Sequence, residues 1–226
     1  TGGSIDGTPV GATTPSTGEF TTVTTTGNVD VTGTVTADGL TVDGDASIIT
    51  LNNTDTSLTI GQTLAKIDIK QNDPSDQGVG VVASIEVENK GSIQGLGQFN
   101  FKTGSATSLS TGLSITDSND VHLYEDTGTT AKFVWDASAE SLGIGITSPS
   151  AKLDIRESGA STDATINLVG TNSLSSASCI SQIKSKESSA GSGSSELSFS
   201  TRRVGDAFGS PTEAMRIDSS GNVGIG

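Results

Sequence analysis

Short stretches in which apolar and polar residues alternate recur along most of the chain. The clearest have an apolar residue at every second position: 66–70, 84–88, 98–102, 152–156 and 196–200. Shorter pieces of the same kind occupy 29–31, 40–42 and 57–60. Because successive side chains of a strand point to opposite faces, each piece places its apolar residues on one face. No stretch sustains the i, i+3, i+4, i+7 spacing of a helix. The pattern therefore predicts an all-β protein with thin, one-sided cores.

Residues 23–46 follow a shorter period. Glycines recur there at positions 27, 33, 39 and 44, and most are followed by β-branched or aliphatic residues. Glycine tolerates the positive φ of a tight turn. Turns this close together are too frequent for a globular domain and are typical of a narrow solenoid or an intertwined triple β-helix. One copy buries almost nothing in such a shaft, whereas three copies around a threefold axis pack their Val and Leu residues into one core.

The rest of the chain shows a diffuse duplication. Residues 47–54 resemble 164–171, and the succession of 98–101 and 113–121 is repeated as 196–199 and 215–223. We therefore expect two related β modules, 47–125 and 160–226, the second cut at its C-terminal end. Residues 1–22 are expected to form a connector that leads into the shaft.

A Gly-rich hairpin unit is predicted between the modules, at residues 126–159. Its central part, Asp136 to Gly145, matches the terminal stretch Asp218 to Gly226. In each copy an Asp opens a turn, because its side chain bonds nearby backbone groups. Gly residues then flank a strand bearing one Ile and permit close backbone approach. The alternatives are a loosely packed hairpin within one chain or close approach near a symmetry axis, and the repeated use of the unit favours the second.

Composition sharpens the choice between order and disorder. Leu, Ile, Val and Phe make up 51 of 226 residues, so the chain has little apolar material to offset the entropy of ordering. With the patterning above, this favours thin cores shared between identical neighbours. The net charge of −14, without a Lys/Arg cluster, argues against nucleic-acid binding. The apolar runs are far shorter than the ~20 residues of a membrane span, and the single cysteine excludes an intrachain disulfide.

Three segments resemble elements of phage tail fibres and other virion appendage proteins. Ile5–Val23 is similar to a segment that precedes the shaft repeats of that family, and Ala214–Gly226 is similar to a second element. Residues 143–155 complete this second element with Thr-Ser-Pro and Lys-Leu-Asp-Ile, although Ile146 is an extra residue. The resemblance implies a homotrimeric, rod-like, extracellular virion component, often from phages of marine bacteria, whose partners are its own copies and other tail proteins. Because both termini look like cuts, we expect a piece of a longer polypeptide.

Candidate chemistry is sparse. The single histidine, His122, lies in an alternating stretch without a motif that supplies a nucleophile or carboxylate beside it, so a surface or interface histidine is expected. Cys179 lies in an apolar stretch without partners for a metal site and is expected to be a small core residue. The stretch 143–145 is no phosphate loop, because no helix follows it.

Carboxylates are scattered through predicted turns, at Asp43, Asp45, Asp117, Asp120 and Asp126. Two of them could meet across subunits at a spacing suited to glycan cleavage. Carbohydrate clefts usually display aromatic platforms, however, and this chain has only Trp135, Tyr124 and six Phe. The run 117–120 lacks the length and terminal Glu of a calcium-binding EF-hand loop, so a solvated Asx-rich turn is expected. The sequence predicts no catalytic, cofactor-binding or metal-binding residue, and no enzyme.

The predicted function is structural: a trimeric spacer or shaft of a phage tail fibre that presents host-recognition elements. The alternatives are a module of the fibre that itself binds a host receptor or glycan and, less favoured, a tailspike glycan depolymerase or a bacterial surface adhesin. No membrane insertion is expected.

Overall fold

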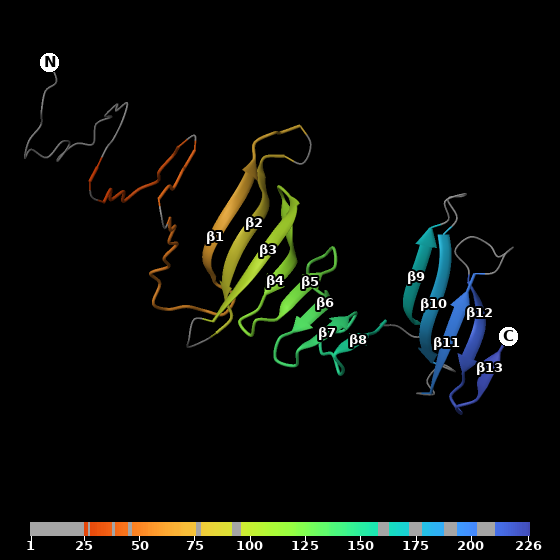
Figure 1. Ribbon diagram of the computed structural model, residues 1–226. Coiled ribbons are helices and arrows are strands. Elements are labelled where there is room, and N and C mark those ends of the chain that lie inside the picture. The colour runs from red at the N-terminus through yellow and green to blue at the C-terminus, as the bar shows by residue number, and fades with distance from the viewer. Residues whose placement is uncertain are drawn as a thin grey trace, which may run out of the picture. The chain divides into compact units, whose positions relative to one another are not determined.

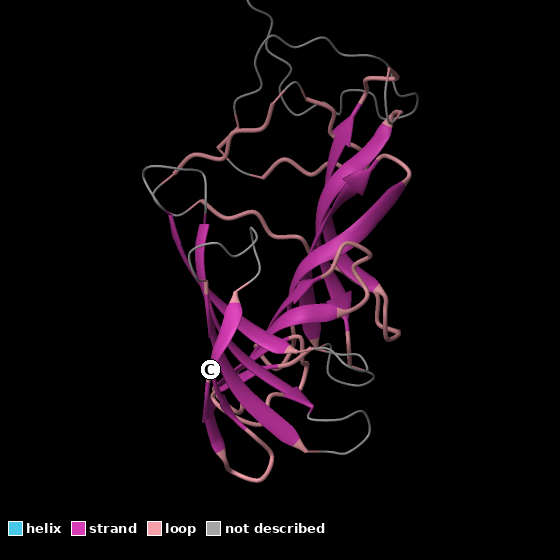
Figure 2. Cartoon of the chain, turned by 90° about the vertical axis from the view of Figure 1, so that its right-hand side faces the viewer, coloured by secondary structure: helices cyan, strands magenta, loops and turns pink. Residues whose placement is uncertain are grey.

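The structure is a computed structural model that describes residues 25–26, 28–37, 39–44, 47–75, 78–91, 96–157, 163–171, 178–187, 194–202 and 211–226. It divides into two units, residues 1–50 and 51–226. All regular structure in the described part consists of strands (Figure 2), which confirms the predicted all-β class. Within those ranges, no helix is long and apolar enough to cross a membrane.

The larger sheet, sheet A, contains eight strands in sequence order (Figure 1). Neighbouring strands are antiparallel, except that the last strand runs parallel to the one before it. The strands are β1 (Thr63–Gln71), β2 (Gly80–Asn89), β3 (Gly97–Ser105), β4 (Ser108–Ile115), β5 (Val121–Tyr124), β6 (Ala131–Asp136), β7 (Ser141–Ile144) and β8 (Leu153–Ile155). The five strongest alternating stretches of the sequence lie in β1, β2, β3, β8 and, in the second sheet, β11.

The second sheet, sheet B, contains five strands, also joined in sequence order. All its neighbouring strands are antiparallel. They are β9 (Ala164–Thr171), β10 (Ser178–Glu187), β11 (Ser195–Thr201), β12 (Thr212–Ile217) and β13 (Val223–Ile225). Both sheets are thus built from neighbours in sequence, which is the arrangement that short connections favour.

The strand register of sheet A aligns its apolar residues in two rows that cross all eight strands. Because directly paired residues point to the same face of a sheet, the rows form one surface, here called the apolar face of sheet A. The first row is Ile67, Ile85, Phe101, Leu113, Leu123, Phe133, Ile144 and Ile155. The second is Ala65, Val87, Phe99, Ile115, Val121, Trp135, Leu142 and Leu153.

This apolar face is open in the single chain. Phe99 is 47% exposed and Trp135 40%, and among the described residues the only buried hydrophobic ones are Ala131 and Val134. A sheet ordinarily buries its apolar face against a second layer of structure. The predicted one-sided apolar pattern is therefore confirmed, but Phe99 and Phe101, which the sequence predicted as core residues, are not buried within one chain.

The two sheets share local features at positions that the predicted duplication aligns. The register shifts after Phe101 on β3 and at the equivalent position, after Phe199 on β11. The turns after β4 and β12 share two backbone hydrogen bonds and a positive φ at their fourth residue, Asn119 (φ 68°) or Gly221 (φ 84°). Segment 47–54 is not a strand, so its predicted match to 164–171 is wrong. Instead, β1 corresponds to β9, because each is the first strand of its sheet and pairs with the strand that follows it, β2 or β10.

Three predicted strand pieces are not strands in the single chain, and two of them, 29–31 and 40–42, lie in the predicted shaft. The structure assigns no strand at 29–31, 40–42 or 57–60. In the piece 57–60, hydrogen bonds within a turn take the place of strand pairing. The backbone amide of Ser57 donates to the Asp55 carboxylate, and the backbone amide of Gln62 donates to the Thr59 carbonyl. Gly61 follows with a φ of +87°, which turns the chain into β1.

The described part of the predicted shaft, within residues 25–44, contains no strand and leaves its aliphatic side chains in solvent, Leu40 being 79% exposed. Because the shaft was predicted to form between three chains, a single chain does not test it. The connector predicted at 1–22 lies outside the described residues. Sheet A also continues through the boundary predicted at 125/126, since β5 pairs with β6 across it. Residues 126–155 thus extend the first sheet, because the hairpin unit presents the same apolar alternation as the strands before it.

The glycines of the hairpin unit serve close approach within the chain. A Cβ at Gly143 would overlap the carbonyl oxygen of Ile146, and one at Gly145 would overlap that of Arg156. Gly145 also has a φ of +76°. For this copy, the approach is therefore made by the connection to β8 and not by a symmetry-related chain.

We predict that Gly145→Ala destabilises sheet A by about 2 kcal/mol or more, because it adds a steric overlap to a positive φ. Urea unfolding followed by the fluorescence of Trp135, the single tryptophan and a residue of β6, measures the change at fixed protein concentration. Gly224→Ala is the matched control, since no atom lies within 4 Å of a Cβ built there. Equal midpoints for the two variants would contradict the close approach.

Candidate functional surface

The face of sheet A opposite the apolar rows carries a polar row. It runs across the eight strands as Lys66, Glu86, Asn100, Ser114, His122, Val134, Gly143 and Asp154. Its members on β2 to β4 are more buried than the apolar face: Glu86 is 7% exposed, Asn100 2% and Ser114 0%. Polar side chains that are this buried need partners, and most of these have them.

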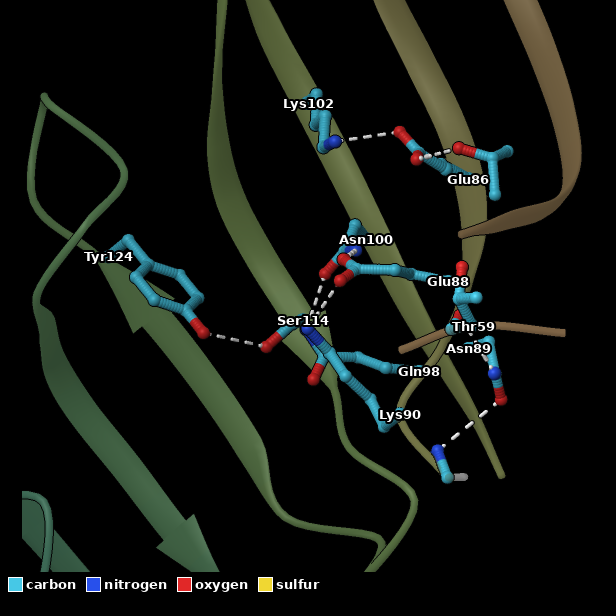
Figure 3. A network of polar contacts seen from close by, with 12 residues as sticks. Thr59, Glu86, Glu88, Asn89, Lys90, Gln98, Asn100, Lys102, Ser114 and Tyr124 are labelled. Carbon is cyan, nitrogen blue, oxygen red and sulfur yellow. Dashed lines mark hydrogen bonds and ion pairs between the residues drawn. The ribbon is translucent and has the colours of Figure 1, made fainter. Parts of the chain in front are cut away.

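Glu86 is the charged centre of this row (Figure 3). Its carboxylate accepts a hydrogen bond from Lys102 Nζ at 2.7 Å and one from Thr63 Oγ1 at 2.6 Å. Burial alone would raise the pKa of Glu86, but the bonds from Lys102 and Thr63 and the charges of Lys102 and Lys66 outweigh it and lower the pKa below its ordinary value. Glu86 is therefore an anion held by its neighbours.

A second group of contacts continues the network toward the start of the sheet (Figure 3). Glu88 accepts from Lys90 Nζ at 2.6 Å and from Asn100 Nδ2 at 3.0 Å, while Asn100 Oδ1 accepts from Gln98 at 2.6 Å. Asn89 is fully buried and donates to the carbonyl of Thr59 at 2.9 Å. These bonds connect β2 to β3 and to the segment before β1. The network therefore holds the chain in place where it enters the sheet.

His122 lies in β5 within the same polar row. Its Nδ1 is 3.5 Å from the hydroxyl of Tyr124, and that hydroxyl is 3.1 Å from Ser114 Oγ. The His122 and Tyr124 rings meet edge to face, with centroids 6.1 Å apart. Because Ser114 has no exposed surface, it is not placed to attack a substrate. His122 is half-buried, and the chain of contacts reads as part of the structural network.

The other residues singled out in the sequence lie apart. Asp117 and Asp120 fall in the β4–β5 turn, where the Asp120 carboxylate accepts a hydrogen bond from the backbone amide of Ala137, in the β6–β7 connection, at 2.8 Å. Asp126 lies in the β5–β6 turn, Asp43 lies in the first unit, and Asp45 lies outside the described residues. Across the described ranges, no group of three or more His, Cys, Asp or Glu is placed to hold a metal ion. Cys179 lies in β10, as a strand residue.

The surface most suited to a function is the apolar face of sheet A. Sheet B repeats it on a smaller scale, with rows Ile166, Ile183, Phe199, Met215, Ile225 and Ala164, Ser185, Leu197, Ile217, Val223. Exposed apolar patches of this extent mark interaction sites. The alternating stretches revealed the apolar positions of each strand in the sequence, but the alignment of those positions into rows depends on register, which no single stretch contains.

Comparisons with known proteins give few matches. No family profile matches the chain, and no curated protein matches it. Among solved structures, it is similar to the carboxy-terminal domain of the bacteriophage T5 L-shaped tail fibre, with 10% identity and a TM-score of 0.33, over 80% of this chain and 87% of that one. The same domain with its intra-molecular chaperone domain gives 10% identity and a TM-score of 0.33, over 83% of this chain; the match spans 62% of that chain. These TM-scores are too low to infer a shared fold.

We predict that Lys102→Met destabilises sheet A at pH 7 by about 1–3 kcal/mol, because it leaves the buried Glu86 carboxylate without its cation. Since the pKa of Glu86 is lowered in the folded state, the stability it contributes is present above the ordinary value of 4.5 and is lost as pH falls through the lowered value. The difference between variant and parent should therefore shrink at pH 3. Urea unfolding at both pH values measures it.

Lys152→Met is the control for this prediction. Its ion pair with Glu140 is 3.3 Å long, and both side chains are largely exposed. Loss of such a pair changes stability little. A deficit for Lys102→Met that is the same at pH 3 and pH 7 would show that the lysine stabilises through its alkyl chain and not through Glu86.

Proposed function

We propose that this chain is a structural subunit of a homotrimeric phage tail fibre, in which it acts as a spacer or shaft during host adsorption. The observation that carries the proposal is the apolar face of sheet A: two uninterrupted apolar rows across eight strands, open to solvent in the single chain. The tail-fibre role and the number of three chains come from the sequence resemblance of Ile5–Val23 and Ala214–Gly226.

The size of the face favours a protein partner. Eight strands at about 4.8 Å spacing extend over roughly 34 Å, which exceeds the reach of a small ligand. Burying a large aliphatic or aromatic side chain contributes about 1.5–3 kcal/mol, so covering several of these residues per chain would stabilise an assembly strongly.

Identical copies are the simplest cover for this face. Each copy brings the same apolar face, so the interface is apolar on both sides. The polar row remains on the opposite side, and the net charge of −14 per chain favours a soluble fibre. In this arrangement the exposed aliphatic residues of 25–44 would join the same assembly as its shaft.

We propose, in addition, that the fibre is extracellular, that its further contacts are with other virion tail proteins, and that the chain carries out no catalysis. The polar row supports the absence of catalysis, because Glu86, Asn100 and Ser114 are buried. Glu86 is bonded to Lys102 and Asn100 to Glu88, so these side chains do not open onto a cleft.

We predict a mass of three times 22.7 kDa for the chain at micromolar concentration, measured by sedimentation equilibrium. Phe99→Lys, on β3 within the apolar face, should shift the mass toward that of one chain, because a buried ammonium group is costly in an apolar contact. Asn72→Lys adds the same charge at an exposed position after β1 and should leave the mass unchanged. A parent chain that sediments only as a monomer would overturn the proposal.

A further inference from the structure

Matching positions of the two sheets can be assigned from their registers. The register of β3 with β4 shifts after Phe101, and the register of β11 with β12 shifts after Phe199. Phe101 pairs with Ile85 of β2, and Phe199 pairs with Ile183 of β10. Strands β2 and β10 are therefore equivalent, with Ile85 and Ile183 as the matching isoleucines.

The polar faces of these two strands carry opposite charges. One and three residues after the matching isoleucine, β2 has Glu86 and Glu88, whereas β10 has Lys184 and Lys186. Alternate residues of a strand share a face, so all four lie on the side away from the apolar rows. The apolar pattern is thus repeated between the sheets, while the charge at matching positions is inverted.

In sheet A, the neighbours of these carboxylates are basic. Glu86 is paired with Lys102 of β3 at 2.7 Å, and Lys66 of β1 lies directly opposite it in the register. Glu88 is paired with Lys90 at 2.6 Å. The place of β2 between β1 and β3 is therefore suited to an acidic strand.

In sheet B, the neighbours of the two lysines are acidic. Lys184 Nζ lies 4.0 Å from the Asp163 carboxylate, just before β9, and Lys186 Nζ lies 3.8 Å from the Glu196 carboxylate of β11. Glu196 also holds Arg216 of β12 at 2.9 Å. The place of β10 between β9 and β11 is therefore suited to a basic strand.

An exchange of β2 and β10 would bring like charges together. A β10 strand in the place of β2 would put Lys184 directly opposite Lys66, with Lys102 on its other side. A β2 strand in the place of β10 would put Glu88 directly opposite Glu196, because Lys186 has that position now. Like charges directly opposite one another destabilise a strand pair.

We propose that the inverted ion pairs make strand pairing selective between the two sheets. Sheet A accepts β2 and excludes β10, and sheet B does the reverse, both within one chain and between neighbouring copies. The apolar rows cannot make this choice, since an isoleucine meets a phenylalanine at the matching position of each sheet. Selectivity of this kind needs a repulsive element against the wrong partner, which the like charges supply.

The single cysteine offers a reporter of the exchanged pairing. Cys179 of β10 pairs with Gly170 of β9, four residues after Ile166, the partner of the matching isoleucine. The corresponding position of β1 is Gln71, four residues after Ile67. A β10 strand that paired with β1 in its own register would thus bring Cys179 opposite position 71. In the reporter chain Gln71→Cys, a disulfide between residues 71 and 179 measures this event.

The test compares the reporter chain with an inverted chain, in which the sheet B ion pairs have reversed polarity. Three acidic residues become basic and three basic residues become acidic, so the net charge stays at −14. The inverted chain adds to Gln71→Cys the substitutions Asp163→Lys, Lys184→Glu, Lys186→Glu, Glu196→Lys, Glu213→Lys and Arg216→Glu.

Both full chains are refolded from urea in a glutathione redox buffer, and peptide mass spectrometry gives the fraction of the 71–179 disulfide. We expect at least about threefold more of it in the inverted chain, because its β10 no longer meets like charges in sheet A. Circular dichroism checks that both chains regain their strands. Equal disulfide fractions in two folded chains would overturn the proposal.

Salt gives a second measure that needs only the reporter chain. About 1 M sodium chloride screens repulsion between charges, so the disulfide fraction of the reporter chain should rise. The inverted chain should show no such rise, since its exchanged pairing is not opposed by charge. A reporter chain whose fraction is the same at low and high salt would contradict the selectivity. Because selection acts within a single chain as well, this outcome is separate from that of the sedimentation measurement.

Discussion

Cross-strand register is the constraint on which the rest of this structure depends. In each sheet, directly paired residues share a face, so one slipped residue in any strand would transfer that strand's apolar side chains to the polar side. The observed register keeps one apolar residue per strand in each of two rows from β1 to β8. Since Val134 and Ala131 are the only buried hydrophobic residues in the described part, a chain on its own leaves this apolar surface partly exposed to water. That imbalance is the basis of the proposed closure by further copies.

The polar face complements this arrangement. Glu86, Lys102 and Thr63 form a bonded group on three neighbouring strands, and Asn100 joins Glu88 to Gln98. A charge that is removed from water and loses its partner destabilises the sheet. A slipped register would separate these charges from their partners, so the network disfavours it on the polar face, where there is little hydrophobic burial to do so. It thereby specifies the pairing of β1, β2 and β3, while the rows on the other face remain available for contact.

The sequence predicted the β class and the faces of individual strands well, because alternation such as that of 66–70 or 98–102 is a local property. It failed where local bonds competed with strand pairing: Ser57 and Gln62 bond within a turn, so 57–60 is no strand despite its alternation. The module boundary at 125/126 was also misplaced, because pairing of β5 with β6 is not visible in either segment alone. The polar network was not predicted, since Glu86 and Lys102 lie far apart in sequence and meet only through register. The turn at 116–120 and its equivalent at 218–222 were recognised, because Asp, Asn and Gly there have direct conformational preferences.

The single tryptophan gives the most direct test of whether the apolar face is covered. Trp135 lies in the second apolar row and is 40% exposed in one chain. Quenching of its fluorescence by acrylamide at micromolar protein concentration measures its accessibility. If copies cover the face, Trp135 should be quenched several-fold more slowly than a free tryptophan amide and emit at shorter wavelength. Quenching as fast as that of the free amide, in a chain whose circular dichroism shows intact sheets, would contradict the account.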